Sequence, residues 1–143
     1  MNKIKVGRLL ASGLITFVSF VAIELIIEKM IGDRLFGLPY DDWYADLIIP
    51  NWTIANYVFN IAFALINCIV LMWLYAALRP MFGVGVRTAL ITSAFAFTFV
   101  ATYSVNQANL GIIPVWIAIL ELVYLIIELP VALQVGAWFY EAG

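Results

Sequence analysis

The chain has 143 residues, of which 66% are hydrophobic and 11% charged, and its net charge is −2. Soluble domains are usually about 45–50% apolar and about 25% charged, so this chain has too few polar groups to cover a soluble fold. A bilayer is the solvent that removes this mismatch, which predicts a single integral membrane domain over residues 1–143. No stretch is basic enough to indicate a nucleic-acid partner.

Two residue types that carry much of enzyme chemistry are scarce. The chain has no histidine, and its single cysteine is Cys68. These facts exclude His-ligated haem, a His-based zinc site, a Ser-His-Asp triad and an intramolecular disulfide. We therefore expect no catalytic residues, no cofactor and no metal site, and we expect the protein not to be an enzyme.

Four apolar runs are long enough to span the hydrocarbon, which takes about 20 residues. The first, residues 9–31, resembles a signal peptide but continues past signal length, so we interpret it as a transmembrane helix. The second, residues 52–78, is expected to end at Arg79-Pro80, because proline does not continue a helix cleanly.

The third run, residues 88–105, follows a short glycine-containing turn, and the fourth, residues 112–140, has Pro114 in its first turn. A proline is tolerated there because its missing N–H has no helical partner at that position. The fold class that these runs predict is all-α: a polytopic transmembrane four-helix bundle.

The basic residues predict how this bundle is oriented. With the N-terminus inside, the cytoplasmic side holds five basic residues and the outer side two, in an arrangement that obeys the positive-inside rule. Both termini are therefore expected in the cytoplasm (N-in/C-in). The five inner residues are Lys3, Lys5, Arg8, Arg79 and Arg87, and the two outer ones are Lys29 and Arg34.

The longest connection, residues 32–51, is expected on the outer membrane surface. It combines acidic residues with Tyr40, Trp43 and Tyr44, whose rings suit the headgroup zone. We interpret it as an interfacial loop that anchors helix ends, with a docking surface as the alternative.

Six polar residues inside the apolar runs form the candidate site. A charge at the bilayer centre costs about 2.5–3.5 kcal/mol on insertion scales, so intramembrane acids need an explanation. The two acids of the fourth helix are seven residues apart and share a face, and Thr53 and the asparagines of the second helix fall within a stripe about 60° wide. This pattern predicts a bundle with a polar interior. The six residues are Glu24, Asn56, Asn60, Asn67, Glu121 and Glu128.

These residues allow three interpretations. The first is a proton or cation relay from Glu24 through Glu121 to Glu128, which Pro130 would support by freeing a backbone carbonyl near Glu128. In the second, each glutamate is protonated and hydrogen-bonded to an asparagine, threonine or tyrosine of another helix. In the third, the acids pair with Arg or Lys of a partner subunit.

Two segments carry a resemblance to known proteins. They are W-L-Y-A-A-L-R-P-M-F-G-V-G-V-R-T-A-L, from Trp73 to Leu90, and G-A-W-F-Y-E, from Gly136 to Glu141. They resemble a group of small bacterial four-helix inner-membrane proteins of uncharacterised function, in which a W-L-Y-A-x-x-R-P-x-F-G-x-G turn joins helices two and three. The resemblance covers about a fifth of the chain. It implies a bacterial inner-membrane setting and transfers no activity.

The small size, the short loops and the absence of catalytic groups favour a non-catalytic membrane protein. We expect an accessory or assembly subunit of a larger membrane complex, or a homo-oligomer, whose partners are the lipid bilayer and other membrane subunits or further copies of the chain. The alternative is a small protein that conducts protons or cations through its intramembrane glutamates.

Overall fold

The structure is a computed structural model that describes residues 5–27, 29 and 53–142, so the expected outer loop at residues 32–51 lies outside the described part. Four α-helices account for nearly all described residues, and no strand occurs among them. The all-α prediction is confirmed, and each of the four helices is long and apolar enough to cross a membrane. The helices are α1 (Val6–Ile27), α4 (Ile54–Phe82), α5 (Val86–Asn109) and α6 (Val115–Glu141).

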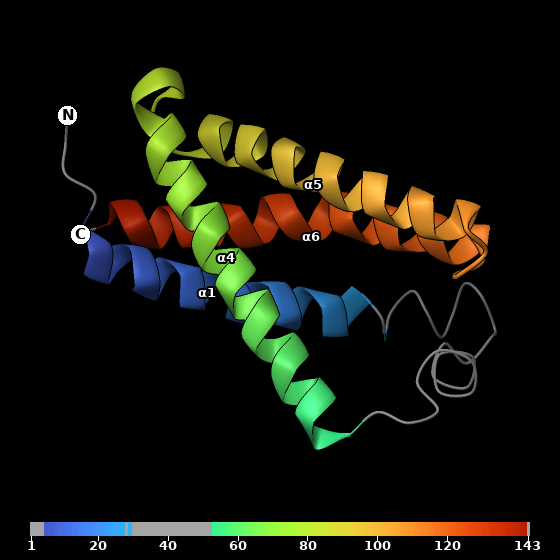
Figure 1. The fold of residues 1–143 in the computed structure, drawn as a ribbon. Helices are drawn as coiled ribbons and strands as arrows, with labels where there is room; N and C mark the ends of the chain where they lie inside the picture. The colour runs from blue at the N-terminus through green and yellow to red at the C-terminus, as the bar shows by residue number, and fades with distance from the viewer. Residues whose placement is uncertain (1–4, 28, 30–52, 143) are drawn as a thin grey trace.

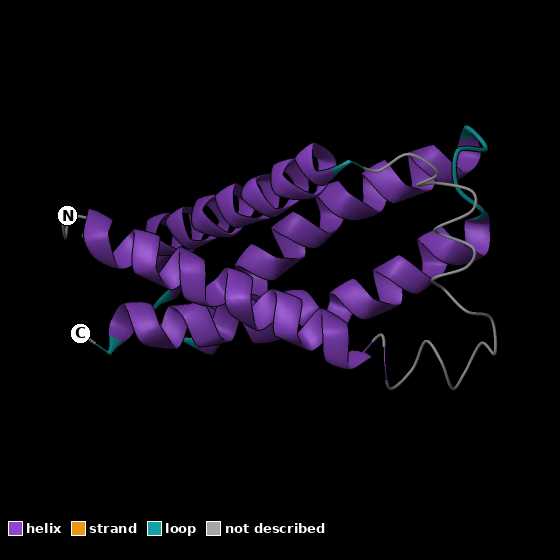
Figure 2. Cartoon of the chain, turned by 90° about the horizontal axis from the view of Figure 1, so that it is seen from below, coloured by secondary structure: helices purple, strands orange, loops and turns teal. Residues whose placement is uncertain are grey.

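The central helix of the arrangement is α6. It packs along α1 on one side and along α5 on the other, while α4 crosses α1 obliquely (Figure 1). The start of α1, the turn between α4 and α5, and the end of α6 lie at the same end of the molecule, which Figure 2 shows from a second direction. We refer to this as the turn end.

The hydrophobic core sits at the turn end, where all four helices meet. Its buried members include Leu9 of α1, Met72 and Tyr75 of α4, Ala89 of α5, and Leu133 of α6. Toward the opposite end α4 diverges from the other helices, and its first half contributes no buried residue. The described bundle is therefore closed at one end and open at the other.

Small residues let α1 approach its neighbours closely. A Cβ atom at Gly13 would lie 2.8 Å from Cα of Ile69 on α4, and a Cβ atom at Gly136 of α6 would overlap Oγ1 of Thr16. Backbones can come this close only where a side chain is missing, which is how small residues drive helix association in lipid. Thr16 and Ser12 donate their hydroxyls to carbonyls of their own helix, so burial leaves these hydroxyls bonded.

Two prolines mark differences from the expected helix ends. The helix expected to end at residue 78 continues through Pro80 to Phe82. Proline has a helical φ and removes only one backbone hydrogen bond, and so near the end of a helix it does not force termination. Gly83 and Gly85 then reverse the chain with φ of 89° and 93°, a region that favours glycine. Pro114 precedes α6 as its N-cap in an extended conformation and does not belong to its first turn.

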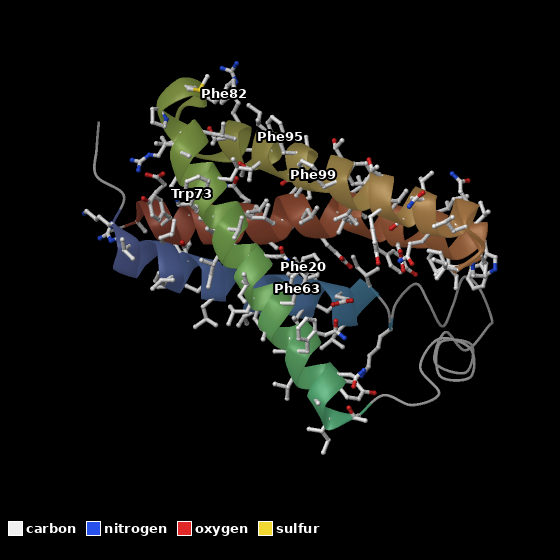
Figure 3. The ribbon with its side chains drawn as sticks, viewed as in Figure 1. Phe20, Phe63, Trp73, Phe82, Phe95 and Phe99 are labelled. Carbon is white, nitrogen blue, oxygen red and sulfur yellow. The ribbon has the colours of Figure 1, made fainter. Side chains whose placement is uncertain are left out.

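Large apolar side chains cover the outside of the helices. Trp73, Phe95 and Phe99 extend outward, and each is more than half exposed (Figure 3). In water such continuous apolar exposure would be unusual, whereas in hydrocarbon it is the expected lipid-facing surface.

Candidate functional site

Of the described acidic residues, Glu128 is the one that is buried. It lies 13 residues from each end of α6, Val115 and Glu141, which at 1.5 Å per residue is about 20 Å from either end. Its side chain is 4% exposed, and its Oε1 has no hydrogen-bond partner among the described residues. A buried polar atom without a partner costs free energy, so this atom calls for an explanation.

Glu24 is the expected site residue of the neighbouring helix α1. It lies one turn before the end of α1, its side chain is exposed, and its carboxylate interacts electrostatically with that of Glu128. The two expected site residues lie on α1 and α6, two helices that pack against each other.

Glu121 has a different neighbour, although it shares a face of α6 with Glu128. Ser104 of α5 donates its hydroxyl to Oε2 of Glu121 at 3.2 Å, across the interface on the other side of α6. Glu121 is half-buried and has further interactions besides this bond. The two glutamates of α6 thus reach toward opposite neighbouring helices.

The asparagines of α4 are not in the interior that the sequence pattern predicted. Asn56, Asn60 and Asn67 are all exposed, because they lie on the half of α4 that diverges from the bundle. Thr53 donates its hydroxyl to Oδ1 of Asn56 at 2.5 Å, a local contact at the start of the helix. We refer to Asn56, Asn60 and Asn67 together as the asparagine stripe.

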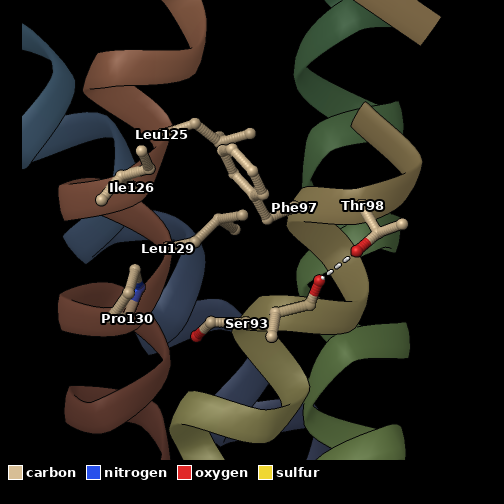
Figure 4. A pocket seen from close by; sticks show the side chains of 8 residues that line it. Ser93, Phe97, Thr98, Leu125, Ile126, Leu129 and Pro130 are labelled. Atoms are coloured by element: carbon tan, nitrogen blue, oxygen red, sulfur yellow. Dashed lines mark hydrogen bonds between the residues drawn. The ribbon is translucent and has the colours of Figure 1, made fainter. Parts of the chain in front are cut away.

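Pro130 lies on α6 beside α5. It lines an apolar groove of about 260 Å³ between α5 and α6, together with Leu129, Phe97 and Ser93 (Figure 4). The hydroxyls at this groove are bonded to their own helix, Ser93 to Ala89 O and Thr98 to Ala94 O, each at 2.8 Å. The groove therefore offers an apolar surface, and Pro130 is part of it.

A cluster at the turn end was not predicted as a site. The hydroxyl of Tyr75 accepts a hydrogen bond from the Gly85 N–H at 2.9 Å and donates one to Oε1 of Glu141 at 3.2 Å. Arg79 forms an ion pair with Oε2 of Glu141 at 2.9 Å and lies 5.9 Å from the ring centre of Tyr140. The cluster fastens the turn between α4 and α5 to the last turn of α6, and we call it the clasp.

The clasp joins the two segments that carry the sequence resemblance. Tyr75, Arg79 and Gly85 belong to the W-L-Y-A-x-x-R-P-x-F-G-x-G segment, and Tyr140 and Glu141 to the closing G-A-W-F-Y-E. Both segments stood out as patterns, but residues 66 positions apart gave no sign of their contact.

No known protein family, curated protein or solved structure matches this chain. Its function has to be argued from the arrangement of its own residues. Within the described ranges, no group of three or more His, Cys, Asp or Glu side chains could hold a metal ion. The polar features that remain are the glutamates around α6, the exposed asparagine stripe and the clasp.

Proposed function

We propose that the protein is a non-catalytic subunit of a larger membrane assembly, formed with other membrane proteins or with further copies of the chain. The observation that carries this proposal is the asparagine stripe on the exposed half of α4. At 100° per residue its three positions fall within about 40° of one another, so they present one polar line along an otherwise apolar helix.

In hydrocarbon, a row of asparagine side chains is more stable when a second helix packs against it and supplies hydrogen-bond partners. An asparagine amide has two N–H donors and a carbonyl, and hydrocarbon satisfies none of them. Hydrogen bonds between transmembrane helices contribute about 0.6 kcal/mol on average and about 1–2 kcal/mol in model peptides. Three asparagines on one face would therefore contribute about 2–6 kcal/mol to the binding of a second helix.

The exposed threonines of α5 differ from the asparagine stripe because their hydroxyls are hydrogen-bonded within their own helix. Thr98 and Thr102 are also exposed, but each donates its hydroxyl to a carbonyl of its own helix at 2.8 Å. A threonine bonded in this way is compatible with lipid and needs no partner. These two threonines provide a matched control for the asparagines.

The proposed setting is a bacterial inner membrane, with the turn end in the cytoplasm. The sequence resemblance supports the first part. The second is supported by Lys5, Arg8, Arg79 and Arg87, which belong to segments at the turn end and agree with the positive-inside rule.

The test is extraction of the tagged protein from native membranes in mild detergent, followed by native mass spectrometry. We expect the wild-type chain of 16.0 kDa to appear in a stoichiometric complex, and the variant with all three asparagines changed to leucine to appear free of it. The T98A/T102A control should keep the complex. A wild-type chain that is monomeric in native membranes, or a triple variant that keeps its complex, would contradict the proposal.

The alternative function, conduction of protons or cations, is tested with purified protein in liposomes. Close packing of α1 against α4 and α6 makes us expect that a pH or sodium gradient persists. A gradient that collapses with the wild type but not with E128Q would favour conduction over the subunit function.

A further inference from the structure

The groove between α5 and α6 has the shape and chemistry of a site for a hydrocarbon chain. Its volume is about 260 Å³, and Phe97 of α5 and Leu125 and Leu129 of α6 form apolar walls (Figure 4). Small-molecule sites are usually about 300–1,000 Å³ and carry polar groups that orient the ligand. This groove is smaller, and the two hydroxyls that line it, those of Ser93 and Thr98, already donate to carbonyls of α5. It therefore offers contact to a narrow apolar chain and no free hydroxyl donor to a polar ligand.

The groove lies at the depth of the acyl chains of one leaflet. On α5 it spans residues 93–98, which at 1.5 Å per residue lie about 10–18 Å from the start of the helix at Val86. The hydrocarbon core of a bilayer is about 30 Å thick, so this depth falls mostly within the leaflet at the turn end. A lipid whose headgroup lies at the turn end therefore has its chains at the level of the groove.

A cation precedes the groove on the same side of α5. Arg87 is exposed in the first turn of α5 and makes no ion pair with a residue that the structure describes, whereas Arg79 is paired with Glu141. At 100° per residue, Arg87 falls within about 40° of Ala94 and Thr98, and these two residues line the groove. Arg87 is seven residues before Ala94, about 10 Å along the helix axis. A phosphate bound by Arg87 would therefore have its acyl chain directed along the groove.

The charge at the turn end favours an anionic headgroup. Basic pockets between transmembrane helices bind anionic lipid headgroups, and the arginine guanidinium can bind a phosphate through two parallel hydrogen bonds. A partner helix with an apolar surface would leave this positive charge uncompensated, so the charge favours lipid over protein as the occupant of the groove. The described side chains at the turn end carry four positive charges, from Lys5, Arg8, Arg79 and Arg87, and one negative charge, from Glu141.

We propose that Arg87 and the groove between α5 and α6 form a binding site for one anionic phospholipid, with the phosphate at Arg87 and one acyl chain in the groove. The proposal rests on the alignment of this exposed cation with the groove along one face of α5. The site is separate from the asparagine stripe of α4 and goes beyond the proposed function.

The experiment measures lipid binding to the purified full chain by native mass spectrometry. The chain in detergent is titrated with phosphatidylglycerol, or with phosphatidylcholine that carries the same acyl chains. We expect one phosphatidylglycerol to bind about fivefold more tightly than phosphatidylcholine, which corresponds to one basic side chain at an anionic headgroup. Phosphatidylglycerol with a photoreactive diazirine in its acyl chain should label the peptides that contain residues 93–98 and 125–130.

Two pairs of variants separate the headgroup contact from the chain contact. R87Q removes the cation and should abolish the preference for phosphatidylglycerol, whereas K5Q removes an equal charge from α1 at the same end and should keep the preference. A94F fills the groove and should weaken the binding of both lipids several-fold. V100F adds a ring at an exposed position of α5 outside the groove and should have no effect. Arg87 and Ala94 are both exposed, so their substitutions are compatible with folding.

Three results would overturn the proposal. Equal binding of the two lipids to the wild type would show that the turn end does not select an anionic headgroup. An equal loss of preference in R87Q and K5Q would show a general attraction by net charge. Binding that A94F leaves unchanged, or labelling confined to other peptides, would place the lipid outside the groove. The measurement needs no partner protein, so this proposal and the subunit function can fail separately.

Discussion

The contact between Gly136 and Thr16 makes a quantitative prediction about what holds α1 to α6. In G136A, the new Cβ atom would overlap Oγ1 of Thr16 and lie 3.0 Å from Sδ of Met72 and 3.2 Å from the carbonyl oxygen of Ser12. The methionine can move, but the Ser12 oxygen is backbone and the Thr16 hydroxyl is held by that same carbonyl. Overpacking of this kind typically costs about 1–3 kcal/mol, and we expect G136A to lose stability in that range.

A double-mutant cycle isolates the contact. T16A removes Oγ1, the atom that the new Cβ would overlap, and the combined T16A/G136A variant should recover part of the stability lost by G136A. Residues in contact show coupling energies of about 0.5–3 kcal/mol, and we expect a coupling within this range. Recovery stays partial, because the backbone oxygen of Ser12 is still 3.2 Å away.

The assay is unfolding in mixed micelles by increasing SDS, followed by tryptophan fluorescence and circular dichroism. Gly7 of α1 supplies the control, because it is also a helical glycine but a Cβ atom there would meet nothing within 4 Å. G7A should be neutral or slightly stabilising, since alanine favours the helix over glycine. If G136A were as stable as wild type, or if the two single changes were additive, the close approach of α1 and α6 would be refuted.

Two further predictions concern the turn end. Y75F removes the hydroxyl that accepts from Gly85 and donates to Glu141, and it should cost about 1–3 kcal/mol in the same unfolding assay, at about 0.5–1.5 kcal/mol per bond. The neighbouring exposed Trp73 gives the control W73F, which should cost much less, and equal costs would contradict the role of the Tyr75 hydroxyl. Reporter fusions after Gly143 and within residues 37–46 should report the cytoplasm and the outer side respectively, because of the positive-inside rule, and a shared compartment would contradict the predicted topology.

The four helices could be predicted because each apolar run meets a single requirement, the thickness of the hydrocarbon. Their ends were less predictable. Arg79-Pro80 is a strong stop signal, but α4 continues to Phe82, where Gly83 donates its N–H to the carbonyl of Arg79 at 2.9 Å. The reversal of the chain is set by glycines with positive φ and not by the proline.

The polar residues show what a periodic pattern can and cannot determine. Spacing puts Glu121 and Glu128 on one face of α6, but it could not indicate that Ser104 of α5 donates a hydrogen bond to Glu121 or that Glu128 is buried while Glu121 is half-buried. The asparagines of α4 share a face as expected, but that face is exposed. The crossing of α4 over α1 decides this, and it depends on a contact between residues 13 and 69.

That contact is also the point about which a tilt of α4 would displace both of its ends. Gly13 and Ile69 touch at one short stretch of α4, and 15 residues separate Ile69 from the start of the helix at Ile54, a distance of about 22 Å along its axis. A rotation of about 10° around the contact would move Ile54 by about 4 Å. The same rotation would act on the clasp through Tyr75 and Arg79, which lie on the short arm beyond the pivot. A partner that tilted the first half of α4 about this contact would therefore also displace Tyr75 and Arg79.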